Sequence, residues 1–181
     1  MDTETRKTTP AEAAALQAAR DEFIAQWGAM GSAWGINRTM AQIHALLITA
    51  PTPLATDEIM EELKISRGNA NMNLRELYGW GLIRSAIRKG ERKEFFEAEK
   101  DVWKMFCTIV RERKRREIRP ALNALKDVAG RTAGLKSAEA VAFHKEITAL
   151  SEFMEIADGV LSKIVRSEGS TMVPWALKFL K

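Results

Sequence analysis

The side chains best suited to molecular recognition lie in one short polar stretch, SRGNANMNLR, at residues 66–75. Asparagine is a poor helix former, yet Asn69, Asn71 and Asn73 occur together in a segment that otherwise has a helical pattern. Asparagine amides and arginine guanidinium groups match the hydrogen-bonding edges of adenine and guanine in the major groove of DNA. The stretch therefore predicts a helix that contacts bases, with Asn73 nearer the core. The alternative is an exposed helix with incidental asparagines.

A helical wheel separates this stretch into two faces. Ala70, Leu74, Leu77 and Tyr78 follow the i, i+4, i+7, i+8 pattern of an apolar face, so we expect the core on that side. A glycine near the start of a helix lets backbone amides approach a phosphate closely. The residues of this helix that we expect to contact DNA are Ser66, Arg67, Gly68, Asn69, Asn71, Met72 and Arg75.

Two short β-type segments follow, at residues 82–87 and 94–98, and a basic loop with Gly90 at its tip joins them. A hairpin loop that follows a helix-turn-helix is placed to touch DNA phosphates or the minor groove. The alternative is a solvated hairpin tip. The loop residues that we expect to contact DNA are Arg88, Lys89, Arg92 and Lys93.

Helical periodicity accounts for most of the remaining chain. The first helix is expected to have an apolar stripe and then a glycine-rich break: Leu16, Phe23, Trp27 and Met30, with Gly28, Gly31 and Gly35. Four polar residues are expected to cap the helices that follow them, and Asp101 is expected to start a long helix: the caps are Asn37, Thr56, Ser66 and Ser137. Pro120 is expected to kink or divide the long helix that Asp101 begins. The expected helices outside the polar stretch are residues 11–30, 37–48, 57–64, 102–128, 137–166 and 171–180.

The positive charge of the chain is concentrated in two segments. The whole chain has 28 Lys and Arg against 24 Asp and Glu, a net charge of +4. Residues 64–93 contain eight basic side chains against two acidic ones, and residues 111–119, RERKRREIR, contain six against two. The rest of the chain is acidic overall, which indicates a surface that faces a polyanion. For residues 111–119 the alternative is a solvated helical face.

The sequence offers little to enzyme chemistry. His44 and His144 are far apart and have no metal-ligand spacing, so we expect no catalytic residues, no metal site and no cofactor. Cys107 lies among apolar residues and is expected to be an inert core thiol. The start of the sequence has no signal-peptide pattern, and no apolar run reaches the ~20 residues of a membrane span. We therefore expect a cytoplasmic protein that is not an enzyme and has no membrane partner.

Three segments together resemble a known family: WGINRTMAQIHALL at residues 34–47, TDEIMEELKISRGNANMNLRELYGWGLI at 56–83, and KGERKEFFEAEKDVWKMFCTIVRERKRRE at 89–117. They resemble the GbsR-like branch of the MarR-type winged-helix transcriptional regulators. The resemblance covers residues 23–119, and SRGNANMNLREL is its most specific part. It implies a mainly α-helical homodimer that binds double-stranded DNA, with a winged helix-turn-helix, a small β-hairpin wing and long N- and C-terminal dimerisation helices.

The resemblance also implies an organisation and a function. We expect a disordered tail at residues 1–10, a dimerisation helix and linker at 11–36, a winged-helix domain at 37–99 and a helical dimerisation region at 100–181. Members of the family are typically repressors, and several control uptake or synthesis of compatible solutes such as glycine betaine. We expect a repressor with a pseudo-palindromic operator. A winged-helix module that binds DNA without reading its sequence is the alternative.

Five tryptophans are candidates for an effector site, because aromatic faces attract quaternary ammonium groups. Trp27 and Trp34 flank the glycine-rich break, and Trp103 opens the helix that follows the hairpin. These three residues could bind a small osmolyte effector. The alternative is that the tryptophans pack in the core and at a dimer interface.

Overall fold

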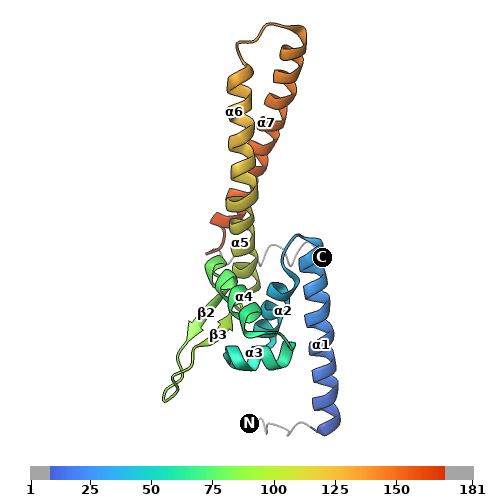
Figure 1. Ribbon diagram of the computed structural model, residues 1–181, viewed down its shortest axis with the longest axis vertical. Coiled ribbons are helices and arrows are strands. Elements are labelled where there is room, and N and C mark those ends of the chain that lie inside the picture. Colours follow the sequence, from blue (N-terminus) through green and yellow to red (C-terminus); the bar gives the residue numbers. More distant parts are fainter. Residues whose placement is uncertain (1–8, 170–181) are drawn as a thin grey trace, which may run out of the picture. The chain divides into compact units, whose positions relative to one another are not determined.

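The computed structural model describes residues 9–169 and divides into two compact units, Met1–Lys100 and Asp101–Lys181 (Figure 1). The first unit contains α1 (Pro10–Ala33), α2 (Arg38–Thr49), β1 (Leu54–Ala55), α3 (Thr56–Leu63), α4 (Arg67–Trp80), β2 (Ile83–Ala86) and β3 (Phe95–Ala98). The second contains α5 (Val102–Arg113), the π-helical segment η1 (Lys114–Ile118), α6 (Arg119–Thr132) and α7 (Ala138–Arg166). The expected fold class, a mainly helical winged helix with a small sheet, is confirmed. The helix expected at residues 171–180 lies outside the described residues.

Helix α1 begins earlier than the sequence predicts. The Thr9 hydroxyl accepts a hydrogen bond from the Glu12 N–H at 3.3 Å, and the Glu12 carboxylate accepts one from the Thr9 N–H at 2.7 Å. This reciprocal pair is a capping box, which fixes the start of the helix. Thr9 and Pro10 therefore belong to the helix start and not to the tail expected at residues 1–10, whose first eight residues lie outside the described part.

Of the three glycines expected to break the first helical pattern, Gly28 and Gly31 do not do so, whereas Gly35, just after the helix ends at Ala33, has a φ of 75°. A Cβ atom on Gly28 would lie 2.7 Å from Cγ of Gln42, and one on Gly31 would lie 2.6 Å from Cβ of Ala41. Both neighbours belong to α2, so the two glycines permit α1 and α2 to pack closely while the helix continues to Ala33. The sequence alone could not predict this role, because it does not show which residues of α2 face the two glycines.

The centre of the core of the first unit is formed by α2, α3, α4 and β3. Ile43, Leu47, Ile59, Leu77 and Phe95 are fully buried, and they come from α2, α3, α4 and β3. The apolar stripe expected on α1 is not part of this core to the same degree. Leu16 and Met30 are exposed, Phe23 and Trp27 are half-buried, and the buried side of α1 passes through Ile24 instead.

The three strands form an antiparallel sheet in the order β1-β3-β2. Phe95 in the central strand lies opposite Ala55 on one side and Ala86 on the other. Strand β1 has two residues and was not predicted, because so short a segment carries no alternation of polar and apolar residues. It ties the start of α3 to the hairpin.

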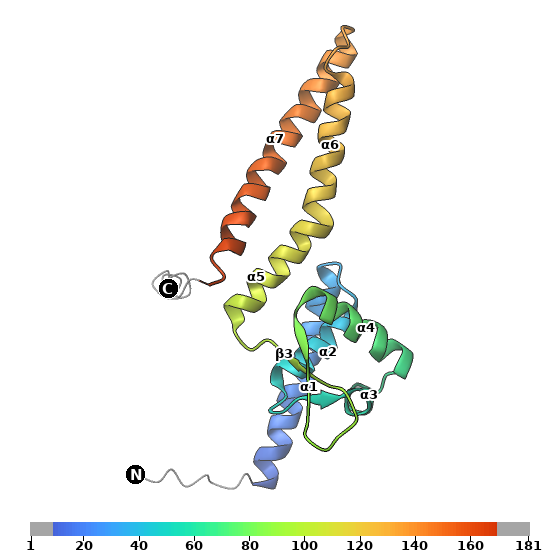
Figure 2. The same cartoon turned by 90° about the vertical axis from the view of Figure 1, so that its left-hand side faces the viewer.

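The described part of the second unit is a helical hairpin in which α6 and α7 lie side by side (Figure 2). Asp101 and Ser137 cap α5 and α7 as predicted, and α7 ends at Arg166. Pro120 has no N–H, and its ring would clash with the carbonyl of Arg116 four residues earlier. The expected kink takes the form of the π-helical segment η1 directly before the proline. No helix among residues 9–169 is long and apolar enough to cross a bilayer.

Candidate nucleic-acid interface

Helices α3 and α4 are joined by a tight turn that sets the direction of α4. Lys64 ends α3 in the left-handed conformation with φ of 52°, and the Ser66 hydroxyl caps α4 by accepting from the Asn69 N–H at 3.3 Å. The Ser66 cap was predicted. The predicted cap at Thr56 is wrong, because Ala55 occupies the cap position. The Glu58 carboxylate accepts a hydrogen bond from the Ala55 N–H at 2.6 Å.

One face of α4 is buried as the sequence predicts, with one exception. Ala70, Leu74 and Leu77 are at most 2% exposed, whereas Tyr78 is 57% exposed. Eight residues turn an α-helix about 80° beyond two full turns, so Tyr78 lies at the edge of the face that Ala70 begins. The prediction that Tyr78 points into the core is wrong.

The outer face of α4 carries the side chains that could contact base edges. Met72 and Arg75 are exposed and Asn71 is half-buried. Asn71 and Arg75 line a concavity of about 310 Å³ together with residues of α3, α4, the hairpin loop and β3: Thr56, Leu74, Tyr78, Glu94 and Phe96. No ion pair of Arg75 occurs within residues 9–169. The concavity thus presents one amide and one guanidinium group side by side.

Two of the three asparagines are used inside the helix. The buried Asn73 side chain donates from Nδ2 to the Asn69 carbonyl oxygen at 2.8 Å and to Asn69 Oδ1 at 2.7 Å. These bonds satisfy an amide that would be costly to bury without partners. The second bond also uses one of the two lone pairs with which the Asn69 amide oxygen could accept from a base, and it fixes the orientation of that amide. Asn71 is therefore the asparagine of α4 best placed for base contact.

Asp57 connects α3, α4 and the hairpin loop through two ion pairs. Its Oδ1 lies 2.5 Å from Arg67 Nη2, and its Oδ2 lies 3.3 Å from Lys93 Nζ. The hydrogen bond from Lys93, then the nearby Arg67 charge, lowers the pKa of the Asp57 carboxyl. Two cations expected to contact DNA are thus paired with one carboxylate in this structure. Asp57 was not singled out from the sequence, because an acid in the first turn of a helix is already explained by the helix dipole.

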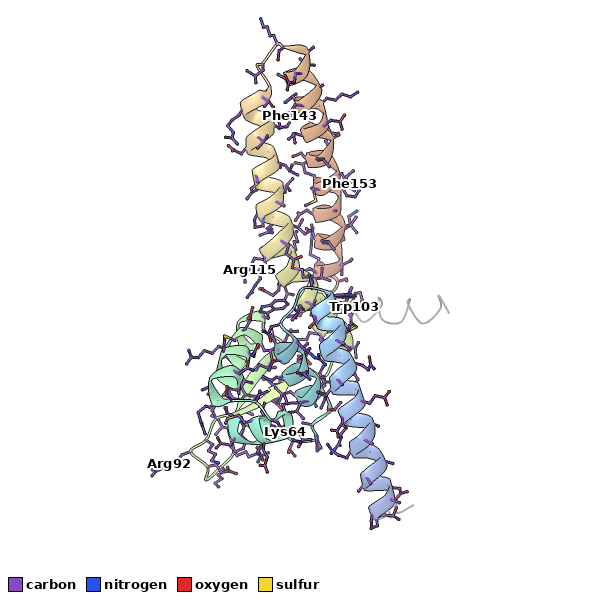
Figure 3. The ribbon with its side chains drawn as sticks, turned by 45° about the vertical axis from the view of Figure 1, so that its right-hand side comes forward. Lys64, Arg92, Trp103, Arg115, Phe143 and Phe153 are labelled. Carbon is purple, nitrogen blue, oxygen red and sulfur yellow. The ribbon has the colours of Figure 1, made fainter. Side chains whose placement is uncertain are left out.

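The hairpin loop contains two kinds of basic side chain. Arg88 is half-buried: its Nη2 donates to the Pro53 carbonyl oxygen at 2.5 Å, and its guanidinium carbon lies 4.2 Å from the centre of the Phe95 ring. Lys89 and Arg92 are exposed, and no ion pair of either occurs within the described residues. Figure 3 shows Arg92 projecting from the loop. Arg88 thus anchors the loop, while Lys89 and Arg92 are available to phosphates.

A strand-to-strand ion pair lies at the base of the hairpin. Arg84 on β2 is opposite Glu97 on β3, and Arg84 Nε lies 2.6 Å from Glu97 Oε1. Gly90 at the tip has φ of 88°, a conformation that L side chains adopt rarely. The hairpin and its glycine tip agree with the sequence prediction.

Comparison with known proteins finds similarity to transcriptional regulators. No family model matches the chain. The chain is 26% identical over 116 residues to the HTH-type transcriptional repressor GbsR of Bacillus subtilis (strain 168), which is 64% of each protein. It is 23% identical over 94 residues to the putative HTH-type transcriptional regulator YvaV of the same organism, covering 52% of this chain and 53% of YvaV. The chain is thus similar in sequence to GbsR. The resemblance to GbsR-like regulators that the sequence suggests is confirmed.

A solved structure supports the fold. The crystal structure of a transcriptional regulator superposes with a TM-score of 0.65 at 14% identity, over 83% of this chain and 98% of that chain. Both sequence relatives carry the names of transcriptional regulators. The chain matches less than two thirds of the length of each of these relatives.

The three tryptophans proposed for an effector site have different surroundings. Trp27 packs on Phe23 with ring centroids 5.4 Å apart, and its ring lies 6.3 Å from that of His44. Trp103 donates from Nε1 to the Ser167 carbonyl oxygen at 3.2 Å. Trp34, at the end of α1, is 61% exposed. Trp27 and Trp34 belong to the first unit and Trp103 to the second, so each unit alone presents only part of the proposed set.

Proposed function

We propose that this protein is a sequence-specific DNA-binding transcriptional regulator that acts as a repressor. The observation that carries the proposal is the pairing of Asn71 and Arg75 on the outer face of a capped α4. Arg75 supplies the donors for a guanine edge, and Asn71 supplies a donor and an acceptor for an adenine edge. Lys89 and Arg92 supply phosphate contacts from the hairpin loop, which fix the position of α4 in the major groove.

We also propose that the protein works as a homodimer, with α7 as part of the interface. Four apolar side chains on α7, spaced by three or four residues, are each more than half exposed: Leu150, Phe153, Ile156 and Val160. Figure 3 marks Phe153 on this helix. A contiguous apolar stripe of this kind is costly to leave in water and suits a second copy of the same helix. A two-fold dimer would bind a pseudo-palindrome with half-sites about one helical turn apart.

The effector proposal is that a small osmolyte with a quaternary ammonium group controls operator binding, and that the regulated genes serve compatible-solute uptake or synthesis. Trp34 carries this proposal, because 61% of its surface is exposed and it lies at the end of α1 beside the glycine-rich segment. An osmolyte would release DNA only if it binds one conformation of the protein better than another. Titration of glycine betaine against the wild type and Trp34→Ala, followed by operator affinity, tests it. Unchanged operator affinity with betaine, choline and ectoine would contradict it.

Selection from a random-sequence DNA library tests the function itself. We expect the full-length protein to enrich one motif with two inverted half-sites, and Asn71→Ala to lose the preference at one position of each half-site. Enrichment without any motif would favour the alternative, a winged-helix module whose binding is almost entirely phosphate electrostatics. In that case Lys89→Ala would lower the affinity for DNA at least as much as Asn71→Ala, and neither variant would change a sequence preference.

A further inference from the structure

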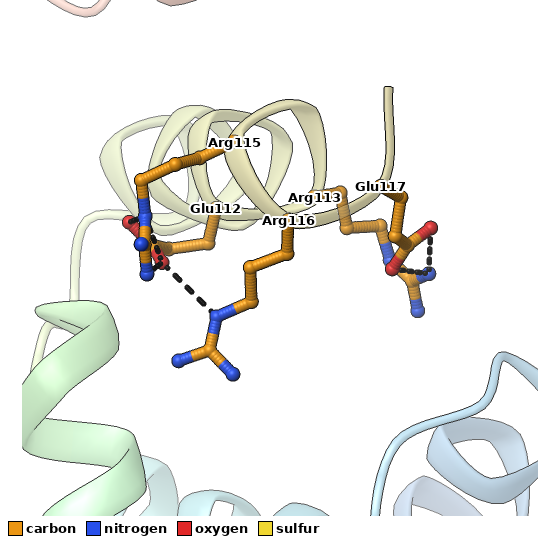
Figure 4. Close-up of polar contacts among 5 residues, drawn as sticks. All are labelled: Glu112, Arg113, Arg115, Arg116 and Glu117. Carbon is orange, nitrogen blue, oxygen red and sulfur yellow. Dashed lines mark hydrogen bonds and ion pairs between the residues drawn. The ribbon is translucent and has the colours of Figure 1, made fainter. Parts of the chain in front are cut away.

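The basic run at residues 111–119 belongs to the second unit, and part of it forms ion pairs along its own helix. The Glu112 carboxylate lies 2.7 Å from Arg115 Nη2 and 3.4 Å from Arg116 Nε, and Arg113 Nη1 lies 3.0 Å from Glu117 Oε1 (Figure 4). The hydrogen bond from Arg115 lowers the pKa of Glu112. For these residues the solvated helical face, left open by the sequence, is an adequate account.

Lys114 behaves differently, because it is buried and reaches across to α7. Its residue surface is 8% exposed, its Nζ lies 3.1 Å from Asp158 Oδ2, and it donates to the Ser162 hydroxyl. Lysine is rarely buried unless it is paired. Asp158 Oδ1, on the same carboxylate, is buried without a hydrogen-bond partner among the described residues. A buried cation of the basic run therefore lies between α7 and η1.

The π-helical turn places a second cation next to Lys114. The Arg119 N–H donates to the Lys114 carbonyl oxygen, five residues earlier, so these two residues stack one turn apart. A regular α-helix would stack Arg119 on Arg115 instead. The cause is Pro120, which disfavours the regular turn before it. Such turns occur often at functional sites, and this one concentrates basic side chains on one face.

These side chains line a concavity of about 500 Å³ that contains cations and no carboxylate. Its lining residues come from α5, η1, the first residue of α6 and the last two turns of α7: Arg111, Lys114, Arg115, Arg119, Ser162, Val165 and Arg166. Three of the cations have acidic partners outside the lining, namely Glu168 for Arg111, Asp158 for Lys114 and Glu112 for Arg115. For Arg119 and Arg166, no ion pair occurs within residues 9–169. The helix dipole of α7 favours a cation at its end and explains Arg166, but it does not explain Arg119.

We propose that this concavity is a binding site for a small polyanion, a molecule that bears phosphate groups or several carboxylates. Its volume falls in the range of small-molecule sites. Arginine is the preferred residue for bidentate contacts to phosphate and carboxylate oxygens, and neither Arg119 nor Arg166 forms an ion pair with any residue of the described part of the chain. Lys114 adds a fixed point charge and Ser162 a hydroxyl group. The site is separate from the Asn71 and Arg75 face, and it stands or falls independently of the proposed DNA-binding function.

Calorimetric titration of the full-length protein with pyrophosphate and with citrate, at ~0.15 M salt, tests the site. We expect saturable binding of at least one of them. The double variant Arg119→Ala, Arg166→Ala should weaken it at least tenfold, because it removes the two guanidinium groups of the concavity that have no acidic partner among residues 9–169. These residues are exposed, so the variant should fold, which a thermal melt verifies. Arg131→Ala, exposed on α6 and paired with Asp127 at 3.1 Å, is the matched control and should bind like the wild type.

Three results would overturn the proposal. The first is that neither anion binds saturably to the wild type. The second is that Arg131→Ala loses as much affinity as the double variant, which would mean that the total charge matters and not the concavity. The third is that the double variant binds pyrophosphate and citrate normally while the salt dependence of its DNA binding becomes weaker, which would assign the basic run to the DNA backbone instead.

Discussion

Replacing Asp57 by asparagine should strengthen DNA binding and make it more sensitive to salt. The Asp57 carboxylate lies 2.5 Å from Arg67 and 3.3 Å from Lys93, so it competes with phosphate groups for both cations. Asparagine keeps the size of the side chain and its place in the first turn of α3, but removes the charge. The two cations are then free to neutralise phosphates.

The size of the effect follows from counterion release. Each additional phosphate contact makes the slope of log K against log salt more negative by about 0.9. With one or two cations released, the slope should become more negative by about 1 to 2. If the variant and the wild type bind equally at ~1 M salt, where screening removes the phosphate contribution, this difference in slope makes the variant bind about 8-fold to 60-fold more tightly than the wild type at ~0.1 M salt. The gain should be similar for a preferred site and a scrambled site, because phosphate contacts carry no sequence information.

The assay is fluorescence anisotropy of labelled duplexes between ~0.05 and ~0.3 M salt, with Glu61→Gln as the matched control. Glu61 is an exposed acid on the same helix, and no ion pair of it occurs within residues 9–169. Its loss changes the net charge equally without releasing a cation. An Asp57→Asn slope equal to that of the wild type, or to that of Glu61→Gln, would refute the competition. Weaker binding by Asp57→Asn would instead mean that the carboxylate holds the hairpin in its binding position.

Four further predictions rest on the described contacts. Arg92→Ala should reduce the salt slope by about 1 and leave the melting temperature unchanged. Arg88→Ala should lower the free energy of unfolding by about 1–2 kcal/mol, because its guanidinium donates to a backbone carbonyl and lies over a phenyl ring; equal melting temperatures for the two variants would contradict this difference. Burial lowers the pKa of His44 to about 4. The unfolded chain then takes up a proton between pH 6.5 and 4 that the folded chain does not, so the free energy of unfolding should fall by up to about 3 kcal/mol as pH decreases through this window. His44→Leu should flatten this part of the stability profile measured by urea titration, and an unchanged profile would be inconsistent with a buried neutral imidazole. The double variant Phe153→Glu, Ile156→Glu should convert a dimer into a monomer in sedimentation velocity, and a wild type that is already monomeric at ~10 µM would contradict the proposed interface.

Local signals accounted for much of the fold. The caps at Asn37, Ser66 and Ser137 were predicted because a side-chain oxygen at the start of a helix acts within three residues. The hairpin around Gly90 was predicted from turn chemistry for the same reason. What failed depends on partners that lie far away in the sequence. Gly28 was expected to break a helix because its close neighbour, Gln42, could not be known.

The candidate site shows the same division. The sequence indicated the chemistry of Asn71 and Arg75, since their types and their face of the helix are local properties. It did not separate them from Asn73, because only the tertiary fold buries Asn73 and directs its amide to Asn69. Nor did it show that Asp57 pairs with basic residues ten and thirty-six positions away. Electrostatic partners across elements have no periodicity that a sequence pattern could reveal.

The measurement that tests the central claim most directly compares Arg75→Ala with Arg84→Ala on the selected site and on a scrambled duplex of equal length. Arg84 is the matched control, because it is an exposed arginine of the same unit that is already paired with Glu97. For Arg75→Ala we predict a loss of about 1–3 kcal/mol on the selected site and little change on the scrambled one. Arg84→Ala should keep the ratio of the two affinities at the wild-type value. Equal losses by Arg75→Ala on both duplexes, or an unchanged affinity ratio, would contradict base recognition by α4.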